Sequence, residues 1–144
     1  MGKEKILVSA CFVKEGYKYS GGANINQKIL ELSEKYEFVY ICPEVFGGLT
    51  VPRLPSEIVG DKVLNSIGED VTEAFITGAM KSLAIAKENG CTKAILKGRS
   101  PSCGKGFIYD GTFAHNIIEG NGIAAQLLMQ NGITVYTEEE LDQL

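Results

Sequence analysis

Residues 5–12 read Lys-Ile-Leu-Val-Ser-Ala-Cys-Phe, a run of apolar and β-branched positions with a cysteine near its carboxyl end. Residues 38–43 (FVYICP) and 93–97 (KAILK) have the same character, and residues 133–136 (ITVY) have it more weakly. Continuous apolar runs of this length are typical of strands buried on both faces, as in a parallel sheet. The sequence therefore predicts about four buried strands.

Helical patterns lie between these runs, at residues 25–36, 70–89 and 114–130, with a short one at 138–144. Strands that alternate with helices imply right-handed crossovers and a parallel sheet covered on both faces. We therefore expect one α/β domain over residues 1–144. Its fold should be a three-layer α/β/α, Rossmann-like arrangement around a mostly parallel sheet of about four strands.

Two stretches, residues 44–69 and 99–113, show neither pattern. Loops of that length are uncommon in compact domains and are usually functional. Both follow predicted strands, and open parallel sheets bind their ligands beyond the carboxyl ends of the strands. These stretches are therefore the candidate walls of a binding site.

The composition is that of an ordinary globular chain, with a net charge of −4 and 14 scattered Lys and Arg residues. Nucleic acid as a partner needs clustered basic residues. No apolar run reaches the roughly 18 residues that can span a bilayer, and the start, MGKEK, lacks the features of a signal peptide. We expect a cytoplasmic protein, monomeric or homodimeric, whose partner is a small molecule rather than nucleic acid or a membrane.

The four cysteines are better candidates for metal ligands, catalytic thiols or packing residues than for disulfides, because the expected compartment is reducing. Cys11 and Cys42 lie at the carboxyl ends of the first and second predicted strands, and Cys103 follows the third. In a parallel sheet these ends share one edge, so the three thiols should converge. Cys91 precedes the third strand and belongs at the opposite edge, about 20 Å away.

Three convergent thiols allow four interpretations: core packing, a zinc site with an open position for hydrolysis, redox chemistry between two thiols, or an iron–sulfur cluster with one open iron. Packing is disfavoured because Cys42 precedes Pro43 and Cys103 lies in the polar segment SPSCGKG. The residues alone do not separate zinc from a cluster.

Polar residues beside the thiols indicate chemistry. Glu44 places a carboxylate two positions after Cys42, where it is a candidate general acid or base. Ser100 and Ser102 place hydroxyl groups beside Cys103, and such donors tune a metal ligand or orient a substrate.

Five other residues have lesser expected roles. Arg53 and Glu57 are predicted to pair with each other. Tyr109 or Asp110 could face the pocket, and His115 is expected to be a capping or surface residue at the start of a helix.

Several motifs resemble those of the thiouracil desulfidase family: VSACF (8–12), CPEVFGGL (42–49), VPR (51–53), DVTEAF (70–75) and AILKGRSPSCGKGFIYDGTF (94–113). The resemblance covers nearly the whole chain, and CPE and KGRSPSCG are its most specific parts.

The resemblance implies a bacterial enzyme that binds a 4Fe–4S cluster through Cys11, Cys42 and Cys103. It implies that the open iron binds the sulfur of a thiocarbonyl compound such as a thiolated uracil. The products would be the oxo compound and hydrosulfide, with no redox change of the substrate. Glu44 and Ser100 match the positions proposed to activate water and relay protons in the family. The alternatives are a non-catalytic cluster or sulfide carrier and a zinc hydrolase.

One departure lies at residues 18–21, where this chain reads Lys-Tyr-Ser-Gly. The family more often has aspartate at the position of Ser20, so substrate preference is expected to differ there.

Overall fold

The computed structural model describes residues 3–14, 16 and 18–144. Met1 and Gly2, which belong to the start that favours a cytoplasmic location, lie outside the described residues. Four parallel strands form the central sheet: β1 (Glu4–Ser9), β2 (Tyr36–Ile41), β5 (Lys93–Leu96) and β8 (Thr134–Thr137). They lie in the order β2-β1-β5-β8, so the predicted strands and the parallel sheet are confirmed.

Two hydrophobic clusters pack on opposite faces of this sheet. Leu7 belongs to a cluster that includes Ala86 of α3 (Thr72–Glu88) and Leu128 of α4 (Ile123–Gln130). Its neighbours Ile6 and Val8 belong to the other cluster. Successive side chains of a strand point to opposite faces, which explains why β1 is apolar at consecutive positions.

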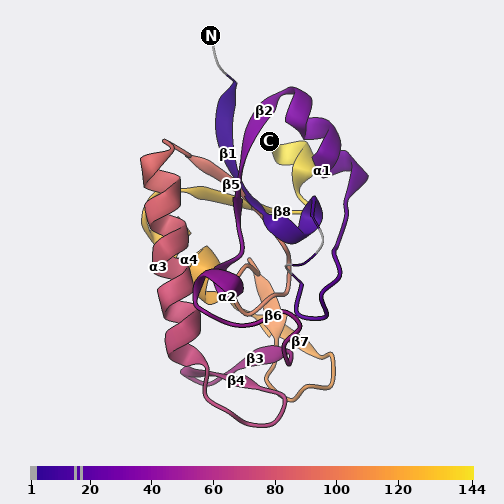
Figure 1. Cartoon of the computed structure of the whole chain (residues 1–144), viewed down its shortest axis with the longest axis vertical. Helices are drawn as coiled ribbons and strands as arrows, with labels where there is room; N and C mark the ends of the chain where they lie inside the picture. Colours follow the sequence, from indigo (N-terminus) through magenta and orange to yellow (C-terminus); the bar gives the residue numbers. More distant parts are fainter. Residues whose placement is uncertain (1–2, 15, 17) are drawn as a thin grey trace.

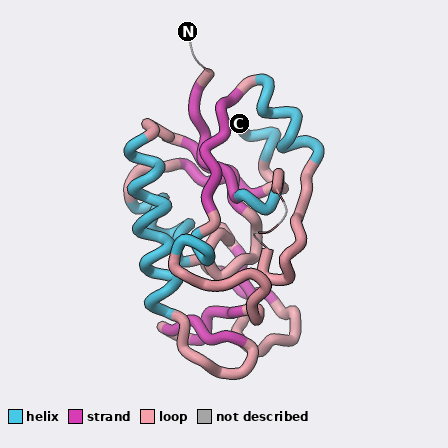
Figure 2. Tube along the Cα trace, in the orientation of Figure 1, coloured by secondary structure: helices cyan, strands magenta, loops and turns pink. Residues whose placement is uncertain are grey.

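The second cluster is covered by α1 (Gln27–Glu31) and by short 3-10 turns, so the molecule has the expected three layers (Figures 1 and 2). The turns are Ala10–Phe12, Leu32–Glu34 and Leu141–Gln143. The last of these replaces the helix expected over 138–144. Within the described residues, no helix combines the length and the apolar character needed to cross a bilayer.

Two antiparallel hairpins extend beyond the carboxyl end of the sheet (Figure 1). One joins β3 (Ser56–Val59) to β4 (Lys62–Asn65), and the other joins β6 (Phe107–Tyr109) to β7 (Ile117–Glu119). With α2 (Pro43–Phe46), they organise the two stretches without a sequence pattern.

The prediction of one helix over 114–130 is therefore wrong in its first half, which contains β7. His115 there has a φ angle of 61°, which does not fit a right-handed helix. The hairpins and α2 surround the edge where β1, β2 and β5 end.

Candidate functional site

The strand register brings three thiols to one level of the sheet. Ser9 is paired with Ile41, the last residues of β1 and β2, so Cys11 and Cys42 follow at almost the same height. Val8 is paired with Ile95 of β5, and Cys103 lies in the segment beyond that strand. Cys91 precedes β5 and is buried in the core at the other edge.

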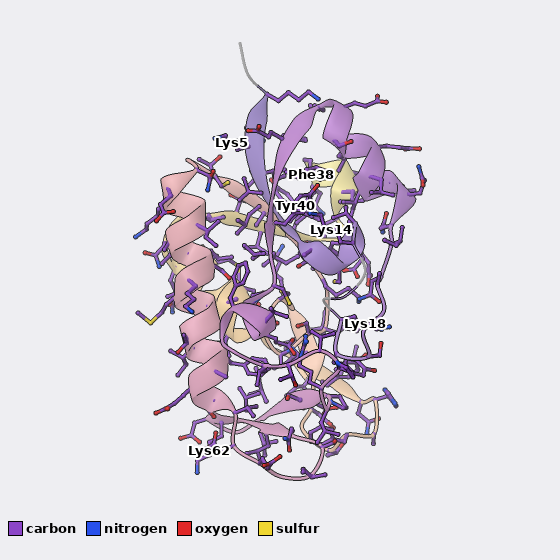
Figure 3. All side chains as sticks on the ribbon, in the orientation of Figure 1. Lys5, Lys14, Lys18, Phe38, Tyr40 and Lys62 are labelled. Atoms are coloured by element: carbon purple, nitrogen blue, oxygen red, sulfur yellow. The ribbon has the colours of Figure 1, made fainter. Side chains whose placement is uncertain are left out.

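The three thiols line a cavity of about 470 Å³. This volume lies in the range of sites for small ligands. The sheet edge and its loops form one side, which we call the thiol wall. Four further lining residues, which we call the aromatic wall, are Tyr19, Tyr109, Phe113 and His115. Lys18, which is labelled in Figure 3, follows β1 in the chain. It lines the same cavity.

Burial keeps these thiols protonated in the absence of a nearby positive ligand. It raises the pKa of Cys103 to about 12, although hydrogen bonds from Ser9 and Ser102 lower it. It also raises the pKa of Cys42, and that of Cys11 even though Asn24 Nδ2 donates to Cys11 Sγ at 3.5 Å. Metals bind the thiolate, so a metal group here must displace the protons and supply positive charge in their place.

The spacing of the donors bears on which metal group would fit. In the part of the chain that the structure describes, no three Cys, His, Asp or Glu side chains are grouped closely enough to hold one metal ion. A tetrahedral zinc site brings its sulfur ligands within about 4 Å of one another. Three thiols that line one cavity can each bind a different iron of a multi-iron cluster, and such ligands need not lie that close together.

A carboxylate and two hydroxyl groups form a hydrogen-bonded chain beside the thiols. Ser102 Oγ donates to Glu44 Oε2 at 3.1 Å, and it lies 2.9 Å from Ser100 Oγ. Because Ser100 Oγ already accepts two backbone N–H bonds, Ser100 is the donor to Ser102, whose own proton goes to Glu44 or to Cys103 Sγ, 3.7 Å away. Ser100 Oγ in turn accepts from the backbone N–H groups of Ser102 and Cys103, both at 3.1 Å. The chain therefore runs from Ser100 through Ser102 toward Glu44 and Cys103.

Arg53 holds the other oxygen of the same carboxylate. Its Nε donates to Glu44 Oε1 at 3.0 Å, and both side chains are largely buried. Glu57, the partner expected from the sequence, instead accepts hydrogen bonds from the backbone N–H groups of Gly111 and Phe113. The expected Arg53–Glu57 pair is thus replaced by Arg53–Glu44, because α2 turns Glu44 toward the segment that carries Arg53.

Close backbone packing positions the Cys-Pro-Glu segment. Pro43 starts α2, where its fixed φ suits a first helical position and its missing N–H is not needed. A Cβ atom on Gly78 of α3 would lie 1.7 Å from Pro43 O, and one on Gly47 would lie 1.9 Å from Ala74 O. Only glycine allows this approach, so α3 fixes the peptide between Cys42 and Glu44.

The Cys103 loop is joined to the start of α4. Pro101 O accepts from Ile123 N at 2.9 Å, and Ser102 O accepts from Ala124 N at 2.9 Å. The first N–H groups of a helix have no partner within the helix, and here loop carbonyls satisfy them. A Cβ on Gly122 would lie 2.6 Å from Ser102 O, so glycine is needed for this contact.

The sequence indicated some of these neighbours and missed others. Tyr109 lines the cavity as one of the expected alternatives, whereas Asp110 accepts from Thr112 in a local turn. His115 is exposed as expected, but it belongs to a hairpin loop and also lines the cavity. Asn24 beside Cys11 was missed, and no local signal marks it. The roles of Cys11, Cys42, Cys103, Glu44 and Ser100 remain predictions at this point.

Fold and cavity define the class of protein: a Rossmann-like α/β domain with a thiol-lined cavity at the carboxyl edge of its sheet. The chain belongs to the 2-thiouracil desulfurase family, whose sequence model matches residues 6–140. YbbK, an uncharacterised protein of Bacillus subtilis, is 43% identical over 96% of this chain and 99% of its own. A solved structure of TudS, a [4Fe–4S]-dependent thiouracil desulfidase, is similar with a TM-score of 0.92 and 39% identity over 99% of this chain and 95% of that one. The resemblance and the fold expected from the sequence are confirmed.

Proposed function

We propose that this protein is a desulfidase that hydrolyses the thiocarbonyl group of a thiolated pyrimidine. The overall reaction is C=S + H₂O → C=O + H₂S, with no oxidant or reductant. The observation that supports it best is the shared cavity of three thiols and Glu44, in a chain 39% identical to a [4Fe–4S]-dependent thiouracil desulfidase.

Cys11, Cys42 and Cys103 would hold a 4Fe–4S cluster that has one iron without a cysteine ligand. When bound, the cluster supplies a thiophilic iron that binds the thiocarbonyl sulfur and makes the attached carbon electrophilic. The protein's task is then to bring water to that carbon and to move protons.

Glu44 is the proposed general base. Arg53 and Ser102 each donate to one of its oxygens, which fixes the plane of the carboxylate, and each oxygen keeps a further lone pair for a water molecule. Ser100 stands at the other end of the hydroxyl chain. We assign to Ser100 and Ser102 the transfer of a proton between the carboxylate and the departing sulfide.

Anaerobic reconstitution with iron and sulfide tests the proposal. We expect a brown protein with about four irons and four labile sulfides per chain, which converts 2-thiouracil to uracil with one hydrosulfide released per turnover. Glu44→Gln should keep the iron and lose at least about a hundredfold in rate.

Two results would contradict the proposal. A fully loaded protein that releases no sulfide from thiolated pyrimidines but passes sulfide to another protein would be a carrier. A colourless protein that retains zinc after anaerobic purification would be a zinc protein.

A further inference from the structure

Glu57 on β3 has an oxygen that the protein does not use. The residue is 7% exposed and lines the cavity. Its Oε1 accepts from Gly111 N at 3.0 Å and from Phe113 N at 3.1 Å. Among the described residues, every buried side-chain nitrogen or oxygen has a hydrogen-bond partner. Oε2 has no such partner in that part of the chain, so it is an accessible atom, and the surface open to it is the cavity.

A purely structural role does not explain a carboxylate at this position. One carbonyl oxygen, such as that of glutamine, could accept both loop N–H groups. A buried carboxylate carries a large desolvation cost that a neutral amide avoids. Glu44, the other carboxylate lining the cavity, has both oxygens engaged by Arg53 and Ser102. Of the two carboxylates, Glu57 is therefore the one with an entire oxygen that no protein group engages.

The surroundings of this oxygen indicate what it accepts from. Glu57 anchors the 110–116 loop, which presents Phe113 and His115 to the cavity, and His115 lies edge-on to Tyr109 with ring centroids 6.0 Å apart. Aromatic walls favour a flat ring. When the sulfur of a flat ring faces the thiol wall, each N–H beside the thiocarbonyl points to the side of the C=S bond, where a carboxylate that lines the cavity, such as Glu57, can accept from it.

We propose that Glu57 accepts a hydrogen bond from a ring N–H of the substrate through Oε2. The site then selects cyclic thioamides that carry an N–H beside the thiocarbonyl, and it rejects analogues alkylated at that nitrogen. This inference rests on the proposed function for the identity of the substrate. Glu57 is a specificity-determining residue, and its anchoring of the loop is a second, separable role.

Glu57→Gln separates the two roles. The amide oxygen can keep both bonds to the loop, while its NH₂ group replaces the acceptor with a donor. Hydrogen exchange at Gly111 and Phe113 reports whether the loop stays anchored. Glu69→Gln is the matched control, because Glu69 is exposed, accepts from Asn65 and lies outside the cavity lining.

The readout is equilibrium binding, measured by calorimetry with uracil and with its N1-methyl and N3-methyl derivatives on the reconstituted protein. A hydrogen bond to a charged group contributes enough for a ten- to hundredfold change in affinity. We expect Glu57→Gln to lower the affinity for uracil by that factor. Methylation of the nitrogen that Glu57 contacts should lower the affinity of the wild type by the same factor and leave that of Glu57→Gln unchanged. Glu69→Gln should behave as the wild type.

Unchanged uracil binding in Glu57→Gln, or equal sensitivity of both proteins to methylation, would overturn the inference. Because uracil contains no sulfur, these measurements do not depend on desulfuration. If the wild type released no sulfide from 2-thiouracil while Glu57 still governed uracil binding, the proposed function would fail and the inference would stand.

Discussion

Gly78→Ala is the sharpest test of how the site is positioned. A Cβ atom at Gly78 would lie 1.7 Å from Pro43 O and 2.6 Å from Pro43 C. An ordinary contact requires about 3.5 Å, so α2 must move away from α3 by roughly 1.5–2 Å. Both neighbours of Pro43, Cys42 and Glu44, would move with it.

Two opposing terms set the effect on folding. Alanine in a helix interior normally stabilises by about 1 kcal/mol relative to glycine. Overpacking of this size costs about 1–3 kcal/mol. We therefore expect a net loss of up to about 2 kcal/mol in the free energy of unfolding, the opposite of the sign that helix propensity alone gives.

The effect on function should be larger, because a misplacement of about 1 Å can cost a hundredfold in rate. Iron per chain after anaerobic reconstitution and the rate of hydrosulfide release measure it. Thr77→Ala is the control, since Thr77 is the exposed neighbour on the same helix. A Gly78→Ala protein more stable than wild type, with full iron content and unchanged rate, would refute this account of the α2–α3 contact.

Three further predictions address the thiols, the hydroxyl chain and a remote ion pair. Cys103→Ala should lose most of its iron whereas Cys91→Ala keeps it, and equal iron content in the two variants would contradict the choice of ligands. Ser102→Ala should keep its iron but lose about ten- to a hundredfold in rate, because Glu44 loses its hydroxyl donor; an unchanged rate would remove Ser102 from the proton path. Burial raises the pKa of Glu140. The hydrogen bonds from Lys105 and from the Thr137 N–H, together with the positive charge of Lys105, lower it by more, so the net pKa is below its usual value. A lowered pKa stabilises the fold at neutral pH and loses that effect as the pH falls through it. Urea unfolding should show Glu140→Gln about 1 kcal/mol less stable at pH 7, with a gap that narrows as the pH falls through the folded pKa; a gap that stays the same in acid would be the contrary result.

The sequence was most informative where burial alone determines structure. The strands were predictable because residues buried on both faces must be apolar at successive positions. The common edge of Cys11, Cys42 and Cys103 followed from parallel pairing, which needs no side-chain detail.

Local turn signals in the sequence could have located the β3–β4 hairpin and the true start of α4. Gly60 and Asp61 separate two short apolar runs, and such a pair favours a two-residue hairpin. Gly120 and Gly122 similarly interrupt the pattern ahead of α4, which begins only at Ile123.

Other features depend on tertiary contact and have no local signal. The Arg53–Glu44 pair forms because the loop after α2 returns to the site. The contact of Gly78 with Pro43 joins two helices that are distant in sequence. The free Oε2 of Glu57 can be identified only in the folded structure, where backbone N–H groups of the 110–116 loop donate to Oε1.

The construction of the cavity from two kinds of wall has a practical consequence for protein engineering. Each hairpin on the aromatic side completes its own antiparallel ladder, so its loop can be replaced without breaking the parallel sheet. The 110–116 loop, which connects β6 to β7, can therefore be exchanged as a unit. Grafted loops of other lengths and sequences would alter which heterocycles are accepted, while the thiols and Glu44 stay on a scaffold that the graft does not touch.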